Sequence, residues 1–170
     1  CNLVIGASAR ERSIPCPLLD PRECAAMIAD QGGSCRAAVL FGNEQSGLSN
    51  AEMDRCRYLV RIPANPGYSS LNLAAAVQVF TYELRMGCLG ATPPAPSAEE
   101  DEPLATAEDL EGLYAHLERA LIDLDFLDPS NPRHLMRRLR RLYQRARPDR
   151  TELNILRGIL TAAEKAARRS

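Results

Sequence analysis

Residues 40–50 read LFGNEQSGLSN, and residues 62–72 read IPANPGYSSLN before the apolar run LAAAVQVFTYEL. Each stretch places Gly, Pro, Asn and Ser directly against apolar residues, which is the pattern of a buried strand that ends in a loop. Glycine lets a backbone approach another group closely, and proline restricts the shape of a loop. Loops of this kind on a rigid scaffold commonly carry binding sites. The two stretches therefore predict a site at the ends of two strands.

The surrounding residues alternate between expected strands and expected helices. The strands are expected at residues 1–6, 36–42 and 58–63. The helices are expected from 21 to 30 after the cap Asp20, from Ser49 or Asn50 to 55, and from Ser70 or Asn72 to about 89. Residues 7–22 contain three prolines and predict a loop. Alternation of helices with wholly apolar strands predicts an α/β fold with a parallel sheet covered on both faces.

The second half of the chain differs in composition. Residues 1–90 are expected to form the α/β domain, residues 91–104 an acidic, Pro-rich linker, and residues 105–170 a helical extension. Within the extension, helical stretches are expected at residues 106–124, 132–147 and 151–169, the last opening with Thr151 as its cap.

Charge is distributed unevenly along the chain. Residues 97–128 carry eleven acids against one base, and residues 133–170 carry twelve bases against three acids. A nearly neutral chain with a basic end is typical of nucleic-acid binding. In the basic helix, Leu135, Leu139 and Leu142 form the expected docking stripe. The arginines of this helix have two interpretations, RNA binding or pairing with the acidic helix upstream.

Other features exclude several classes of protein. Six cysteines without a CxxC pair, together with two histidines, argue against a metal site. No apolar run is long enough for a transmembrane helix, and no signal peptide begins the sequence, so we expect no membrane association. The composition predicts a cytoplasmic protein with reduced cysteines.

Several segments meet at one edge of the expected sheet. Ligands of open parallel sheets bind beyond the carboxyl ends of the strands. Residues 6–9, Gly42 and residues 62–63 all follow strands, and residues 69–72 lead into a helix N-terminus. From the residues alone, Gly42 could equally serve a simple strand-to-helix turn, and Ser70 and Asn72 could be simple caps.

The motifs also resemble a known family. FGNEQSGL (residues 41–48) and IPANPGYSSLNLAAAVQV (residues 62–79) resemble the second and third motifs of the SPOUT class of RNA methyltransferases. Within that class, GASARERSIPCPLLDPREC (residues 6–24) and LRRLYQRARPDRTELNILRGIL (residues 139–160) are similar to the TrmJ family of tRNA 2′-O-methyltransferases. The resemblance implies a trefoil-knotted α/β domain and a homodimer whose active site draws on both subunits. It also implies S-adenosylmethionine as cofactor and tRNA as substrate, at the 2′-hydroxyl of the pyrimidine at position 32.

The resemblance assigns residues to this activity. The positions that match the cofactor site are Ala7, Ser8, Ala9, Gly42, Ile62, Ser69, Ser70 and Leu71. Apolar contact with the adenine is expected from Leu40, Ile62 and Leu71. The catalytic positions are Glu44, Ser70 and Asn72, which shape the site near the transferred methyl group, and Arg12, expected to contact RNA phosphate or ribose.

One motif of the class is missing. Residues 1–6 read as a core strand, the chain does not begin with Met, and the class's first motif with its Asn and Arg is absent. We therefore expect that an N-terminal part of the domain lies outside this sequence. Two alternatives remain open: a non-catalytic RNA-binding dimer that retains the cofactor fold, and a SPOUT enzyme that acts on rRNA.

Overall fold

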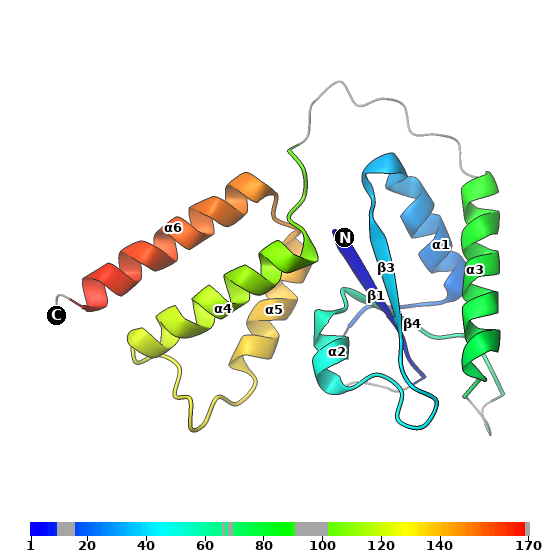
Figure 1. Cartoon of the computed structure of the whole chain (residues 1–170), viewed down its shortest axis with the longest axis horizontal. Coiled ribbons are helices and arrows are strands. Elements are labelled where there is room, and N and C mark those ends of the chain that lie inside the picture. Colours follow the sequence, from blue (N-terminus) through cyan, green and yellow to red (C-terminus); the bar gives the residue numbers. More distant parts are fainter. Residues whose placement is uncertain (10–15, 66, 68–69, 91–101, 169–170) are drawn as a thin grey trace. The chain divides into compact units, whose positions relative to one another are not determined.

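The structure is a computed structural model that describes residues 1–9, 16–65, 67, 70–90 and 102–168 (Figure 1). The chain divides into two compact units, Cys1–Glu100 and Asp101–Ser170. Among the described residues, no helix combines the length and the apolar character that crossing a membrane requires.

The first unit is built on a parallel sheet. Its strands, in spatial order, are β2 (Leu18–Leu19), β4 (Tyr58–Val60), β1 (Leu3–Ala7) and β3 (Ala37–Phe41), and every pair is parallel. The expectation of a loop throughout residues 7–22 was wrong at β2. This two-residue strand is held because the N–H groups of Leu59 and Arg61 donate to the carbonyl oxygens of Pro17 (3.0 Å) and Leu19 (2.9 Å).

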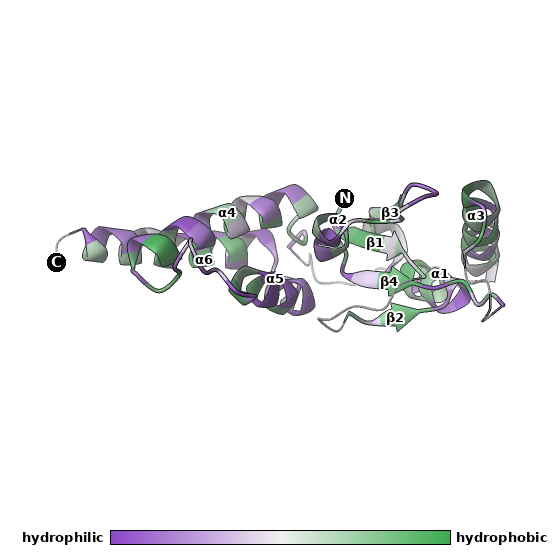
Figure 2. Ribbon diagram, turned by 90° about the horizontal axis from the view of Figure 1, so that it is seen from below, coloured by the Kyte–Doolittle hydropathy of each residue, from purple (hydrophilic) through white to green (hydrophobic). Residues whose placement is uncertain are grey.

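Both faces of the sheet are covered, as the apolar strands predicted. Successive residues of a strand point to opposite faces, so Leu3 and Ile5 of β1 pack with Phe80, whereas Val4 packs with Met53. The first cluster is covered by α1 (Pro21–Asp30) and α3 (Leu73–Gly90), and the second by α2 (Asn50–Arg55). A short 3₁₀ helix spans Gly32–Ser34. Figure 2 shows the hydrophobic colouring of β1 and β2.

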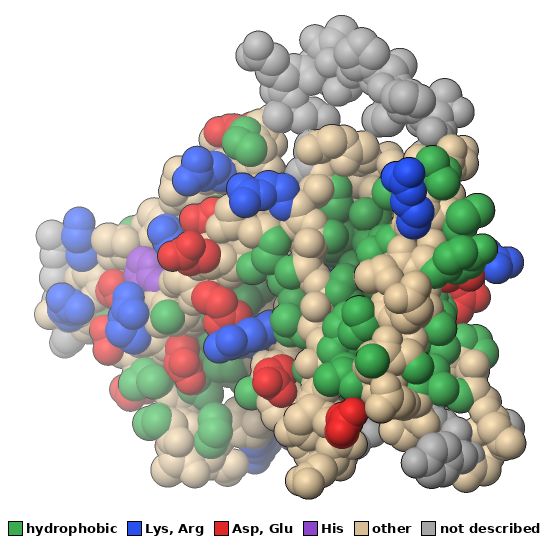
Figure 3. All heavy atoms as spheres, turned by 45° about the vertical axis from the view of Figure 1, so that its right-hand side comes forward, with side chains coloured by type: hydrophobic (Ala, Val, Ile, Leu, Met, Phe, Trp, Pro, Cys, Tyr) green, Lys and Arg blue, Asp and Glu red, His purple; other side chains and the backbone are tan. Residues whose placement is uncertain are grey.

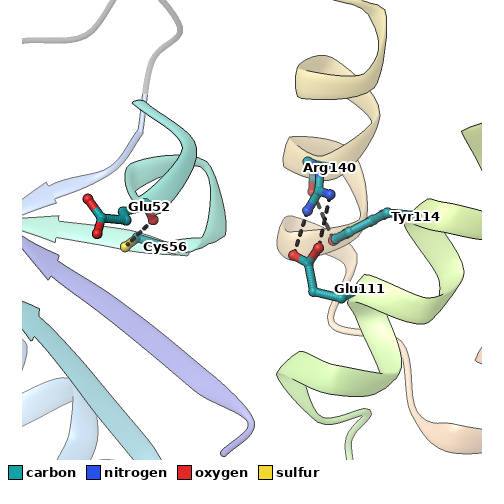
Figure 4. Close-up of polar contacts among 5 residues, drawn as sticks. All are labelled: Glu52, Cys56, Glu111, Tyr114 and Arg140. Carbon is teal, nitrogen blue, oxygen red and sulfur yellow. Dashed lines mark hydrogen bonds and ion pairs between the residues drawn. The ribbon is translucent and has the colours of Figure 1, made fainter. Parts of the chain in front are cut away.

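The helices of this unit begin at capping residues. The predicted cap Asp20 accepts a hydrogen bond from the N–H of Glu23, and Ser49 caps α2 in the same way through Glu52. Each glutamate bonds back to the backbone of its cap, which completes a capping box. At the other end of α2, the Cys56 thiol donates to the carbonyl oxygen of Glu52 (3.3 Å; Figure 4).

The six cysteines, all of which lie in the described residues, form no disulfide. Burial raises the pKa of Cys24 to about 11. Its thiol therefore stays protonated at neutral pH and acts as a core residue.

In its described residues, 102–168, the second unit contains three helices, α4 (Ala107–Asp123), α5 (Leu135–Ala146) and α6 (Arg150–Ala167). Leu113 of α4 and Leu153 of α6 are buried together, and Tyr143 of α5 packs against them. Polar contacts also join the helices. His116 lies 3.4 Å from Glu164, and Arg140 is bound by Glu111 and Tyr114 (Figure 4).

The chain enters this unit through a short segment that is bonded to the turn before α6. The N–H of Ala105 donates to the carbonyl oxygen of Pro148 (3.0 Å), and the N–H of Arg150 donates to that of Pro103 (3.3 Å). The same turn supplies the helix cap. Asp149, and not the expected Thr151, caps α6 by accepting from the N–H of Glu152.

Candidate active site

The strands β1, β3 and β4 end at the same edge of the sheet. Ala7 is in register with Phe41 on one side and with Val60 on the other. The segments that follow these residues are therefore brought to a single edge. This arrangement agrees with the rule that ligands of open parallel sheets bind beyond the strand carboxyl ends.

A cavity of about 340 Å³ lies at this edge. Its walls come from the three strand ends, from the loop after β3 and from the start of α3. Of the residues singled out from the sequence, the lining includes Ala7, Ser8, Ala9, Gly42, Glu44, Ile62, Ser70 and Leu71. The volume falls within the range of about 300–1,000 Å³ that is usual for small-molecule sites.

The loop after β3 forms a closed turn beside the cavity. The N–H of Gly47 donates to the carbonyl oxygen of Asn43 (2.9 Å). The side-chain oxygen of Asn43 accepts from the N–H (2.7 Å) and the hydroxyl (2.8 Å) of Ser46. Gly42 is required by this turn itself, because a Cβ there would lie 2.0 Å from the carbonyl carbon of Gly47.

Asn72 joins the loop to the start of α3. Its side-chain oxygen accepts hydrogen bonds from the N–H groups of Ala74 (3.0 Å) and Ala75 (3.4 Å), so Asn72 caps the helix. Its side-chain amide donates to a carboxylate oxygen of Glu44 (3.5 Å). Glu44 lines the cavity, whereas Asn72 does not. Asn72 thus contributes to the site through its hydrogen bond to Glu44.

The apolar wall differs in part from the expected one. Ile62 and Leu71 line the cavity, but Leu40 packs on the opposite face against the cluster around Met53. Phe41 and Val60 line the wall instead. Strand alternation explains the difference, because adjacent residues such as Leu40 and Phe41 face opposite ways.

The cavity carries little charge. Glu44 is the sole ionisable side chain among the described residues that line it. A lone carboxylate in such a wall favours a cationic ligand group. Within the described ranges, no group of three or more His, Cys, Asp or Glu side chains could hold a metal ion. Arg12 and Ser69, which the sequence assigned to the site, lie outside the described residues.

The arginines of α5 form a second feature of functional interest, and they occupy different environments. The guanidinium of Arg140 donates to both carboxylate oxygens of Glu111 (2.5 and 2.9 Å) and lies 4.5 Å from the ring centre of Tyr114. Arg138 and Arg145 are exposed and lie two helical turns apart, hence on one face. Arg140 is therefore paired with the acidic helix α4, whereas Arg138 and Arg145 form an exposed basic face of α5. Figure 2 shows the hydrophilic colouring of α5.

The expected docking stripe of α5 was wrong at one position. Leu142 is 46% exposed and lies on the same face as Arg138 and Arg145. Tyr143 takes the inward position and packs in the core cluster of this unit.

Comparison with known proteins gives matches across both units. Residues 12–82 match the model of the SpoU rRNA Methylase family, and residues 108–170 match the model of the tRNA methyltransferase TrmJ, C-terminal domain. The chain is 53% identical over 176 residues to the tRNA (cytidine/uridine/adenosine-2′-O-)-methyltransferase TrmJ of Pseudomonas aeruginosa, covering 99% of this chain and 68% of that protein. It is 49% identical over 169 residues to the tRNA (cytidine/uridine-2′-O-)-methyltransferase TrmJ of Cronobacter sakazakii, covering 98% of this chain and 69% of that protein.

A solved structure supports the same assignment. The crystal structure of TrmJ from Z. mobilis ZM4 superposes with a TM-score of 0.79 at 31% identity, covering 96% of this chain and 68% of that one. This similarity, with the parallel sheet and the SpoU match, confirms the predicted fold class, the knotted α/β fold of SPOUT methyltransferases with a helical C-terminal region. The chain belongs to the TrmJ family of methyltransferases.

Proposed function

We propose that this protein transfers a methyl group from S-adenosylmethionine to a ribose 2′-hydroxyl of tRNA. The single observation that carries the proposal is the cavity at the sheet edge, in a member of the TrmJ family. The cavity is lined by residues 7–9, 42–48, 70–71 and 73. The SpoU family implies a methyl donor, and the chemistry of this cavity is what suggests its identity.

The residues of the cavity suit S-adenosylmethionine. We assign the binding of the cofactor to Ala7, Ser8, Ala9, Gly42, Ile62, Ser69, Ser70 and Leu71. Small residues at strand ends expose backbone N–H and C=O groups, which can recognise the adenine edge, and Ile62 and Leu71 offer apolar contact to the ring. The bound cofactor would supply an electrophilic methyl group on a cationic sulfur. Glu44 would complement that positive charge.

The reaction requires that a weak nucleophile be aligned and deprotonated. A ribose hydroxyl must lie in line with the methyl group, and its proton must be accepted as it attacks. We assign Glu44, Ser70 and Asn72 to the shaping of this centre, with Asn72 orienting the Glu44 carboxylate through its amide. Arg12 is assigned to contact with RNA phosphate or ribose.

Exchange of Glu44 for Gln tests the charge argument. Opposite charges about 4 Å apart near a protein surface attract by about 1–4 kcal/mol, so Glu44→Gln is expected to weaken S-adenosylmethionine binding by at least about fivefold. The neutral product S-adenosylhomocysteine should lose much less affinity. Calorimetry with both ligands measures the difference, and Glu118→Gln, on the exposed surface of α4, is the control. Equal losses for the two ligands would show that Glu44 does not face the sulfur.

The substrate proposal rests on both units. The relatives' names agree on tRNA and on the 2′-oxygen, and they differ in the nucleoside, since the Pseudomonas protein's name adds adenosine. We propose the nucleoside at position 32, a pyrimidine in the first instance, and the cytoplasm as the compartment. The match of residues 108–170 to the TrmJ C-terminal domain favours tRNA over the rRNA alternative. Transfer of labelled methyl groups to tRNA, against rRNA, checks this choice.

We also propose that two copies associate through α3. Val79, Tyr82, Met86 and Leu89 are spaced along one face of this helix and are 37–61% exposed. Figure 3 views the molecule from the side of α3 and shows hydrophobic side chains gathered there. Met86→Glu is expected to give monomers in sedimentation analysis, whereas Ile159→Glu, an exposed apolar position of α6, should not. A monomeric unmodified protein would refute the proposal.

The non-catalytic alternative makes a different prediction. An RNA-binding dimer that merely retains the fold would bind tRNA without transferring methyl groups. Such a protein would show the same tRNA affinity with and without S-adenosylmethionine and no labelled product. The retained Glu44, Ser70 and Asn72 favour catalysis.

A further inference from the structure

The loop between α4 and α5 presents an aromatic side chain to solvent. Phe126 is 69% exposed, which is the largest exposure of any large hydrophobic side chain in the described part of the chain. A buried phenylalanine typically stabilises a protein by about 1.5–3 kcal/mol relative to an exposed one, and this ring contributes little of that to the fold.

The backbone holds Phe126 outward. Asp125 has a φ of 55°, in the left-handed region, which reverses the chain at the end of α4. The N–H groups of Phe126 (2.9 Å) and Leu127 (3.0 Å) both donate to the carbonyl oxygen of Leu121. Leu127 is only 4% exposed and anchors the loop in the core. Phe126 therefore lies between two fixed neighbours and is pre-positioned for contact.

The rest of the loop is also fixed by hydrogen bonds. The carboxylate of Asp128 accepts from the N–H (2.8 Å) and the hydroxyl (2.7 Å) of Ser130, and these bonds lower the pKa of Asp128. Arg133, which is exposed, has a φ of 47°. A residue with a side chain in this region costs about 1–2 kcal/mol where glycine would be tolerated. Strain of this kind gathers at functional positions.

The acids Asp123, Asp125 and Asp128 flank Phe126, so the cationic groups that could bind an RNA phosphate are on the α5 side of the loop. The hydrogen bonds from Ser130 keep Asp128 ionised, and Asp123 lies 3.7 Å from Arg168. Beyond the loop, Arg133 and Arg138 are exposed and lead onto the basic face of α5. In chain order, an exposed aromatic ring is therefore followed by exposed cationic side chains.

We propose that this loop binds an unpaired nucleobase of the tRNA, with Phe126 stacked on the base and Arg133 bound to an adjacent phosphate. The proposal rests on the proposed function, because it takes tRNA as the substrate. Proteins read RNA loops mainly by stacking splayed-out bases on aromatic side chains, and such stacking tolerates any base. An RNA duplex without a loop offers no such base.

A tryptophan reporter tests the proposal directly. The sequence contains no tryptophan, so Phe126→Trp introduces a single tryptophan whose emission can be excited apart from that of the tyrosines. Stacking on a base is expected to quench its emission when tRNA is added and to leave it unchanged with an RNA duplex that has no unpaired bases. Ile155→Trp, on an exposed position of α6, is the matched control and should respond to neither RNA.

Affinity measurements complete the test. Phe126→Ala is expected to weaken tRNA binding by about 5- to 150-fold, and Phe126→Trp should restore it. Tight tRNA binding with unchanged emission at position 126 would overturn the stacking site and leave the proposed function standing. Emission that instead shifts to the blue with protein concentration, without RNA, would show that Phe126 contacts a second copy. Failure of the unmodified protein to bind tRNA would overturn both proposals.

Discussion

Replacement of Gly42 by alanine tests how the candidate cavity obtains its shape. A Cβ at this position would lie 2.0 Å from the carbonyl carbon of Gly47 and 2.2 Å from the nitrogen of Leu48. Both atoms belong to the backbone and cannot rotate away. Ordinary contacts begin at 3.4 Å, so the turn must move by about 1.4 Å.

This movement lowers the stability of the folded protein, whereas alanine also lowers the conformational entropy of the unfolded chain, which raises stability. The movement would stretch the bond from the Gly47 N–H to the Asn43 oxygen, now 2.9 Å, beyond hydrogen-bond distance. Overpacking typically costs about 1–3 kcal/mol and a lost hydrogen bond about 1 kcal/mol, whereas Gly→Ala returns about 0.4–1 kcal/mol through the unfolded state. We expect a net loss of about 1–4 kcal/mol and a severe loss of cofactor binding.

Two other glycines provide matched controls for Gly42→Ala. Gly33 has no atom within 4 Å of its would-be Cβ, so Gly33→Ala should be neutral or slightly stabilising. Gly47 is also uncrowded but has a φ of 67°, so Gly47→Ala should cost about 1–2 kcal/mol through strain alone. Urea unfolding and calorimetry on the three variants give the comparison. A Gly42→Ala protein that loses less stability than Gly47→Ala and binds the cofactor normally would refute the steric argument.

Three further outcomes follow from the helical unit. Replacing Arg138 and Arg145 together by alanine should weaken tRNA binding and reduce its log–log salt slope by about two, roughly one per phosphate contact, whereas Arg140→Ala should chiefly lower the melting temperature. Gly158 has open space around its would-be Cβ, so Gly158→Ala should stabilise the unit by about 0.5–1 kcal/mol and raise its melting temperature by a few degrees. Hydrogen bonds from its threonine cap lower the pKa of Asp109, so the stability that this carboxylate contributes is present above its ordinary pKa and is lost as the pH falls through the lowered one. Asp109→Asn should therefore flatten the acid side of a melting-temperature profile.

The edge of the sheet was predictable from the sequence because it depends on topology. Glycine, proline and serine at the ends of apolar runs mark strand ends, and parallel strands bring these ends together. The strand β2 was not predictable, because Leu18–Leu19 is too short to show a pattern and lies beside prolines. The backbone bonds that hold it come from β4, about 40 residues away in the chain.

The surroundings of individual side chains were harder to predict. The arginines of α5 are distributed around the helix. Periodicity alone therefore could not show that Arg140 faces α4 while Arg138 faces solvent. Leu40 was expected in the cavity, but the alternation of β3 turns Phe41 to the cavity and Leu40 to the opposite face. The cap of α6 could have been predicted from the sequence, because Asp149 lies three residues before Glu152, which is the spacing of a capping box.

The segment that precedes α4 determines where the helical unit can be cut from the rest of the chain. The C-terminal family model begins at residue 108, after the cap of α4 and after the bonds that Pro103 and Ala105 make to the turn before α6. A fragment begun at residue 108 would lack the partners of the Pro148 carbonyl oxygen and of the N–H groups of Arg150, Asp109 and Leu110. Fragments that start at or before Glu102 are therefore expected to fold on their own. A fragment that starts at residue 108, where the family model begins, should have a lower free energy of unfolding.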